Sequence, residues 1–153
     1  MLTDRQITLV RESFECIMPR AGEFAGNFYD ALFGLQPALR LLFPNDLAAQ
    51  EKKLIDMLET AVALLNEPER LMPVLEESGR RHALYGVRER NYARVGEALL
   101  QTLRATLGAA FDAETAAAWT HVYGLMSETM IRGGRSLQNP SGAAGIEERE
   151  VKG

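Results

Sequence analysis

Residues 79–92 read GRRHALYGVRERNY, and this stretch holds one of only two histidines in the chain, His82. His82 shares a helical face with apolar Leu75 and with Gly79, so we expect its imidazole to point inward. Gly79 has no side chain, which would let a flat group approach the helix backbone closely. Ser78, one turn earlier, offers an acceptor for one ring N–H. A buried imidazole without a charged neighbour is neutral, and the neutral form binds metals.

The rest of the chain has the apolar period of helices almost throughout. Thr3 followed by Gln6 has the pattern of a capping box and predicts the start of the first helix. Gly86 and Gly108 predict helix ends, and Asp112 predicts the start of the last helix. The predicted segments are about 3–18, 21–35, 37–43, 47–66, 69–85, 88–107 and 112–131. No strand alternation is found, so the predicted fold class is all-α.

The composition changes after about residue 132. The segment 133–153 reads GGRSLQNPSGAAGIEEREVKG, which is rich in glycine, serine and charge and poor in large apolar residues. Such a composition cannot bury enough apolar surface to order itself. The sequence therefore predicts one domain over 1–132 and a flexible C-terminal tail over 133–153.

Charge and cysteine content exclude several classes of protein. The 153 residues carry a net charge of −4, which disfavours nucleic acid as a partner. Cys16 is the one cysteine, so no internal disulfide or zinc cluster can form, and a reducing compartment is expected. The N-terminal MLTDRQITLVRESFE has charges within every apolar run, unlike a signal peptide, and no stretch could span a membrane. We expect a cytoplasmic protein.

The histidine count also narrows the metal chemistry. The sequence has no HExxH motif, no cysteine cluster and no Glu-x-x-His pair. One protein imidazole does not hold zinc or a di-iron centre, but it can hold haem iron, because the porphyrin supplies four ligands. A lone histidine on a helix is more often a structural residue than a ligand, so both interpretations of His82 stay open at this point.

Five pieces of sequence, in this order, resemble those of one known family. They are NFYDALF (27–33), LRLLFPN (39–45), QEKKLIDML (50–58), RRHALYGV with NYARVGEALL (80–100), and AAWTHVYGLM (117–126). Over about residues 2–132 the chain resembles a globin, most of all the single-domain bacterial globins and the haem domains of flavohaemoglobins. The segment 80–100 is the most specific match. The resemblance implies a globin fold with helices packed around haem b, iron protoporphyrin IX.

The resemblance also implies roles for individual side chains. His82 would be the proximal iron ligand, and Tyr92 would hydrogen-bond near it. Tyr29 and Gln50 would lie over the distal face, where a gas binds. Further haem contacts would come from Phe43, Lys53, Leu54, Arg81 and Val87.

Each of these roles has a simpler alternative. Phe43 could be an ordinary core aromatic residue, and Tyr29 could belong to an apolar stripe with its hydroxyl on a backbone partner. Gln50 could be an exposed residue at a helix start. For Lys53 and Arg81, a solvated helix face is the better interpretation.

The distal residues suit a gas ligand. Tyr29 supplies an O–H and Gln50 an N–H, and such donors stabilise bound O2 more in a dry pocket than in water. Because glutamine is a poor iron ligand, the sixth coordination position is expected to be open to O2, NO or CO. His121, between Trp119 and Tyr123, matches no haem-ligand position, so we interpret it as structural or surface.

The chain departs from the flavohaemoglobin pattern at one position. There, a glutamate in the last helix completes a relay with the proximal histidine and tyrosine, whereas the aligned residue here is Gly134. Without that carboxylate, peroxidase-like chemistry is disfavoured. No flavin or nicotinamide domain follows residue 132, so turnover is expected to need a separate reductase.

Three functions remain open from the sequence. The first is a haem globin that binds O2 reversibly and supports NO dioxygenation with a separate reductase. The second is a non-catalytic globin for O2 storage, transport or gas sensing. The third is a helical bundle without haem, which the joint presence of His82, Phe43 and Gln50 disfavours.

Overall fold

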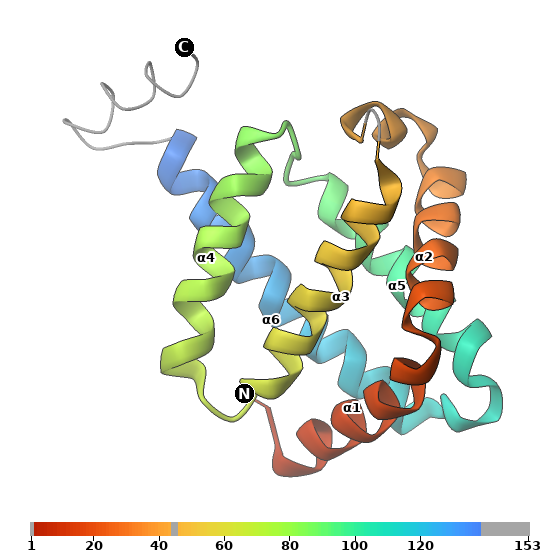
Figure 1. The fold of residues 1–153 in the computed structure, drawn as a ribbon. Coiled ribbons are helices and arrows are strands. Elements are labelled where there is room, and N and C mark those ends of the chain that lie inside the picture. The colour runs from red at the N-terminus through yellow and green to blue at the C-terminus, as the bar shows by residue number, and fades with distance from the viewer. Residues whose placement is uncertain (1, 44–45, 139–153) are drawn as a thin grey trace.

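The computed structural model describes residues 2–43 and 46–138, and within them the chain is helical with no strand (Figure 1). The long helices pack around one core, with α6 crossing behind α3 and α4. The elements are α1 (Asp4–Ile17), η1 (Met18–Arg20), α2 (Ala21–Leu35), η2 (Pro37–Leu42), α3 (Leu47–Ala63), α4 (Pro68–Leu84), α5 (Asn91–Leu107), η3 (Gly108–Ala110) and α6 (Ala113–Gln138). The predicted all-α class is confirmed, and the bounds of α2 agree with those predicted.

Polar side chains fix several helix starts. The Thr3 hydroxyl accepts from the Gln6 amide at 3.0 Å, and Gln6 Oε1 accepts from the Thr3 amide at 3.0 Å, which confirms the predicted capping box. The Asp112 carboxylate accepts from the Thr115 amide at 2.8 Å, as expected of a helix cap. A cap of this kind stabilises a helix by about 1 kcal/mol.

The core is built from the inward stripes of all the long helices. Trp119 of α6 is 1% exposed, and its indole N–H donates to the Ser13 hydroxyl on α1 at 2.8 Å. A buried polar group is costly without a partner, so this bond lets the largest core side chain lie fully inside. The other fully buried large side chains are Val10, Ile17, Phe24, Leu75, Leu103 and Val122.

Helices α4 and α6 cross with their backbones in contact. A Cβ placed at Gly79 would lie 1.9 Å from the Met130 carbonyl oxygen, and one at Gly133 would lie 2.0 Å from the Glu76 carbonyl oxygen. Only glycine leaves room for such an approach. The sequence suggested that Gly79 admits a flat group; that interpretation is wrong, because the space beside Gly79 is filled by the backbone of α6.

The end of α6 differs from the predicted domain boundary. The helix continues to Gln138, and Gly133 and Gly134 are buried against α4. Residues 133–138 therefore belong to the folded unit and not to a tail. Two successive glycines normally disfavour a helix, but Gly133 and Gly134 allow α6 to cross close to α4. The rest of the predicted tail, residues 139–153, lies outside the described residues. Among residues 2–43 and 46–138, no helix has the length and apolar character needed to cross a bilayer.

Candidate functional site

His82 lies in the last turn of α4, and the chain reverses directly after it. Gly86 adopts φ +100°, a left-handed conformation that favours glycine, and this ends the helix as predicted. The Val87 amide then donates to the His82 carbonyl at 3.0 Å, and the Gly86 amide to the Ala83 carbonyl at 3.1 Å. These bonds fix the backbone at the histidine and directly after it.

The His82 imidazole is held by the backbone one turn earlier. Its Nδ1 lies 2.6 Å from the Ser78 carbonyl oxygen and 3.5 Å from the Ser78 hydroxyl. A carbonyl only accepts, so Nδ1 carries the proton and Nε2 keeps its lone pair. The partner predicted at Ser78 is confirmed, and the closer atom is the backbone oxygen.

The electrostatics favour the neutral ring. Burial lowers the pKa of His82 below its usual value, and the charge of Arg81 lowers it further, while the hydrogen bond to Ser78 raises it in part. The imidazole is therefore neutral at physiological pH. A neutral imidazole with a fixed Nδ1–H and a free Nε2 is the arrangement that metal-ligating histidines use.

A second group of side chains gathers where α2, η2 and α3 meet. Tyr29 is 5% exposed and packs against three phenylalanines. Its ring centroid lies 4.9 Å from that of Phe28, 5.5 Å from Phe43 and 5.8 Å from Phe33. Phe33 and Phe43 are 5.8 Å apart. The predicted Tyr29 and Phe43 thus belong to one aromatic cluster.

The Tyr29 hydroxyl is a donor at physiological pH. Burial raises its pKa to about 12, the negative charge of Glu51 acts in the same direction, and a hydrogen bond with Gln50 opposes them. Gln50 therefore lies within hydrogen-bonding reach of Tyr29. That both face a bound gas stays a prediction. Gln50 is half-buried in the first turn of α3, a helix start that Asp46 caps by accepting from the Ala49 amide at 3.2 Å.

Some of the other residues predicted to contact haem are half-buried, and others are exposed to solvent. Leu54, Phe43 and Val87 are half-buried and pack against the core. Lys53 and Arg81 are exposed, and Arg81 lies 3.4 Å from Glu77, which fits the solvated-face interpretation. His121 Nδ1 lies 3.2 Å from Gln6 Oε1, so this histidine has a structural contact between α6 and the start of α1.

Tyr92 lies at the start of α5, 8% exposed, and burial raises its pKa to about 12. The sequence predicted a hydrogen bond near His82, but the ring nitrogen of His82 bonds to Ser78. Tyr92 bonds through its backbone: its amide donates to the Glu89 carbonyl at 3.2 Å, and its carbonyl accepts from the Tyr123 hydroxyl at 2.7 Å. A side-chain hydrogen bond of Tyr92 near His82 stays a prediction.

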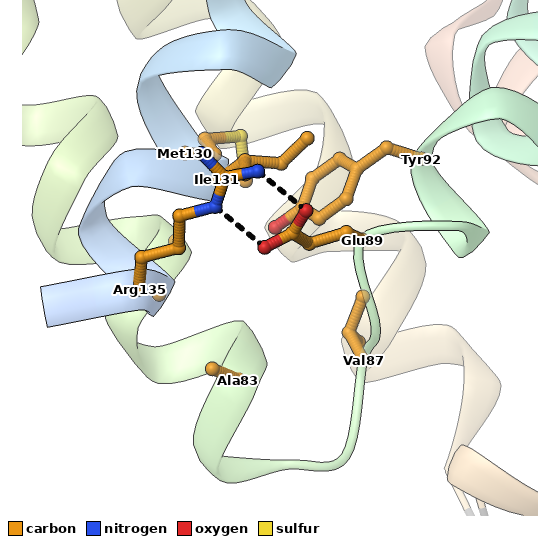
Figure 2. Close-up of a pocket in the computed structure, with 9 residues that line it drawn as sticks. Ala83, Val87, Glu89, Tyr92, Met130, Ile131 and Arg135 are labelled. Carbon is orange, nitrogen blue, oxygen red and sulfur yellow. Dashed lines mark hydrogen bonds and ion pairs between the residues drawn. The ribbon is translucent and has the colours of Figure 1, made fainter. Parts of the chain in front are cut away.

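Figure 2 shows a small cleft between α4, the loop 85–90, α5 and α6, into which the Tyr92 ring points. Glu89 and Arg135 lie at one side of it, joined by two hydrogen bonds of 2.7 and 2.8 Å. The cleft is lined by Gly79, Ala83, Val87, Glu89, Tyr92, Met130, Ile131, Gly134 and Arg135. Gly134, where the resemblance places a glutamate in related chains, is thus in this cleft. No local pattern in the sequence predicts the Glu89–Arg135 pair, because its partners are 46 positions apart.

In the part of the chain that the structure describes, no three histidine, cysteine, aspartate or glutamate side chains group as a metal site would need. The fold and site together define an all-α protein that presents one oriented, neutral imidazole and a separate tyrosine–phenylalanine cluster.

The comparisons with known proteins identify the family. The profile described as Globin matches residues 26–130. A flavohemoprotein of Bordetella parapertussis is 32% identical over 141 residues, covering 90% of this chain and 35% of the relative. A neuroglobin of Danio rerio is 30% identical over 146 residues, covering 86% of this chain and 92% of the relative. The chain belongs to the globin family.

Solved structures agree in fold. A bacterial globin from Campylobacter jejuni matches with a TM-score of 0.78 at 21% identity, covering 90% of this chain and 99% of that one. A hexacoordinated heme protein from an anhydrobiotic tardigrade matches with a TM-score of 0.81 at 21% identity, covering 88% and 96%. The globin fold is thus confirmed. The chain spans about a third of the length of the flavohemoproteins it matches.

Membership of this family implies a haem cofactor and gaseous ligands, and the residues present fit such a group. The His82 ring offers Nε2 as a donor while its Nδ1–H is bound to Ser78. Half-buried apolar side chains suited to a porphyrin face are Leu42, Phe43, Leu54 and Val87.

Proposed function

We propose that this protein is a haem globin that binds O2 reversibly through iron held by His82. The observation that carries the proposal is the His82 ring itself, neutral and with Nδ1 bonded to the Ser78 carbonyl at 2.6 Å. When bound, haem supplies the iron atom at which a gas ligand is held. His82 supplies the proximal nitrogen, and the bond to Ser78 orients it.

Tyr29 and Gln50 are the proposed distal donors. With a pKa of about 12, Tyr29 stays protonated and can donate to a ligand that carries partial negative charge. Its ring packs against phenylalanines and the residue is only 5% exposed, so a hydrogen bond from its hydroxyl is expected to be stronger than in water. Phe43, Leu54 and Val87 would contact the porphyrin.

The further proposed activity is NO dioxygenation. In this reaction NO, O2 and one electron combine to give nitrate, and a reductase supplies the electron. Relatives named flavohemoprotein support this proposal, as does the pair of neutral donors at Tyr29 and Gln50.

The second candidate is a non-catalytic globin for O2 storage, transport or sensing. Gly134 favours it, because a carboxylate at this position would increase electron donation through the proximal histidine. The match to the neuroglobin also supports this candidate. It covers 92% of that relative, whereas the flavohemoprotein matches cover about a third of theirs.

Absorption spectra of the haem-loaded protein test the proposal. The ferrous form should be five-coordinate and should convert on addition of CO or O2. His82→Ala should abolish that spectrum, whereas His121→Ala, the matched histidine control, should keep it. A six-coordinate ferrous spectrum without added gas would contradict the open distal site, and unchanged ligation in His82→Ala would overturn the role of His82.

Measurement of NO consumption then separates the two candidates. Rapid, sustained nitrate formation with a cellular reductase supports dioxygenation. Reversible O2 binding with slow oxidation by NO supports the non-catalytic alternative.

A further inference from the structure

The loop between α4 and α5, residues 85–90, is tied to α6 by a two-point ion pair. Arg135 Nε donates to Glu89 Oε2 at 2.7 Å, and Arg135 Nη2 donates to Glu89 Oε1 at 2.8 Å (Figure 2). Such a paired geometry fixes direction as well as distance. The Arg135 and Glu89 side chains are 61% and 45% exposed, so the contribution of the pair to global stability is small.

The same loop is bonded directly to the backbone of His82. The Val87 amide, two residues before Glu89, donates to the His82 carbonyl at 3.0 Å. Within the loop, the Arg88 amide donates at 2.8 Å to Oδ1 of Asn91, the first residue of α5. Arg135 on α6 is therefore linked to His82 through the Glu89 side chain, the loop backbone 87–89 and the Val87 amide.

The glycine contact explains why Arg135 can reach the loop. A Cβ at Gly134 would lie 3.3 Å from the Ala83 Cβ and 3.4 Å from the Gly79 carbonyl oxygen, so α6 passes close to the last turns of α4. The next residue, Arg135, then reaches from α6 to Glu89 in the loop 85–90.

We propose that Glu89 and Arg135 are positioning residues for His82. Their ion pair holds the loop 85–90 against α6, and the loop in turn holds the His82 backbone and places Val87. The part of this inference that concerns haem rests on the proposed function, whereas the part that concerns the loop does not.

The chain contains a matched control for this pair. Arg5 and Glu114 also form a two-point pair, with both bonds at 2.9 Å. This pair joins α6 to α1, whereas the Glu89–Arg135 pair joins α6 to the loop 85–90. The Arg5 and Glu114 side chains are 63% and 55% exposed. Glu89→Gln and Glu114→Gln therefore remove equivalent interactions, and only the first lies beside His82.

Hydrogen exchange tests the loop without haem. In Glu89→Gln, we expect amide exchange at Val87 and its loop neighbours to speed up about two- to fivefold, as loss of one exposed pair allows. Glu114→Gln should leave these amides unchanged. The double variant Glu89→Arg with Arg135→Glu should restore slow exchange. Equal exchange in all variants would overturn the proposal.

The iron–histidine stretching band of the ferrous, haem-loaded protein, measured by resonance Raman, tests positioning. Glu89→Gln should shift or broaden this band and speed haem loss, whereas Glu114→Gln should change neither. Faster loop exchange with an unchanged band would show that the pair holds only the loop, and would overturn its role toward His82. If the wild-type chain takes up no haem, the proposed function fails, and the exchange result still decides whether the pair holds the loop.

Discussion

His82 and Tyr29 lie in regions of the molecule that are fixed by different kinds of contact. The His82 ring is held by a backbone carbonyl four residues earlier, within one helix. Tyr29 is held by side chains from its own helix, from the corner at Phe43 and from Gln50 on α3. A backbone bond inside a helix keeps its geometry when neighbouring helices shift, but a cluster of three segments does not.

We therefore expect the His82 ring to move together with α4. The position of the Tyr29 ring should instead change whenever one of its neighbouring segments moves. The position of α4 depends in turn on its glycine contacts with α6. Local orientation and global placement of the histidine therefore have separate origins, and substitutions can separate them.

The largest effect is expected from Gly133→Ala. The new Cβ would lie 2.0 Å from the Glu76 carbonyl oxygen, and backbone cannot swing aside as a side chain can. Overpacking of this kind costs about 3 kcal/mol of unfolding free energy, measured by urea denaturation. Gly124→Ala, in the same helix with no atom within 4 Å of its Cβ, should be neutral or stabilise by up to about 1 kcal/mol. Equal stability of the two variants would contradict the close crossing.

Tyr29→Phe is expected to have the next largest effect, and it acts on the other region. It keeps the ring in the aromatic cluster and removes the donor. We expect O2 to leave the haem-loaded protein about tenfold faster, the equivalent of one hydrogen bond worth about 1.4 kcal/mol. Tyr123→Phe, which loses a hydroxyl bonded to the Tyr92 carbonyl, is the control. Flash photolysis and stopped-flow mixing would measure both, and an unchanged rate in Tyr29→Phe would argue against its distal role.

A third prediction follows from the lowered pKa of His82. The unfolded histidine takes up a proton near pH 6.5, but the folded one resists it, so stability falls as the pH drops below about 6.5. Arginine partners lower the pKa of Glu77 and Glu89 from 4.5, so their contribution is lost only at lower pH. Urea midpoints of the protein without haem, measured from pH 7 to pH 5, should show this slope. His82→Gln should flatten it, and His121→Gln should retain it.

The sequence predicted what depends on near neighbours. The capping box at Thr3, the cap at Asp112, the helix end at Gly86 and the Ser78 partner of His82 all rest on contacts within four residues. Local patterns carry such information because the bonding atoms are set by helix geometry.

What the sequence could not predict depends on contacts between distant segments. The glycine at position 79 was assigned to the wrong neighbour, since nothing local shows that Met130 lies beside it. The helix end near residue 132 was predicted too early for the same reason: Gly133 is favourable only because α4 crosses there. The Glu89–Arg135 pair joins two different segments, 46 positions apart, so no spacing within one helix indicates it.

The smallest effect is expected from Ser78→Ala, which tests the local side of the comparison. The Ser78 hydroxyl is 3.5 Å from His82 Nδ1, whereas the carbonyl is 2.6 Å away, so the carbonyl should hold the ring alone. Alanine keeps that carbonyl and suits a helix, so stability should change by less than about 0.5 kcal/mol. Nitrogen NMR of the protein without haem should still show the proton on Nδ1. A proton on Nε2 would mean that the hydroxyl sets the tautomer, and His82, like Tyr29, would then depend on a neighbouring side chain.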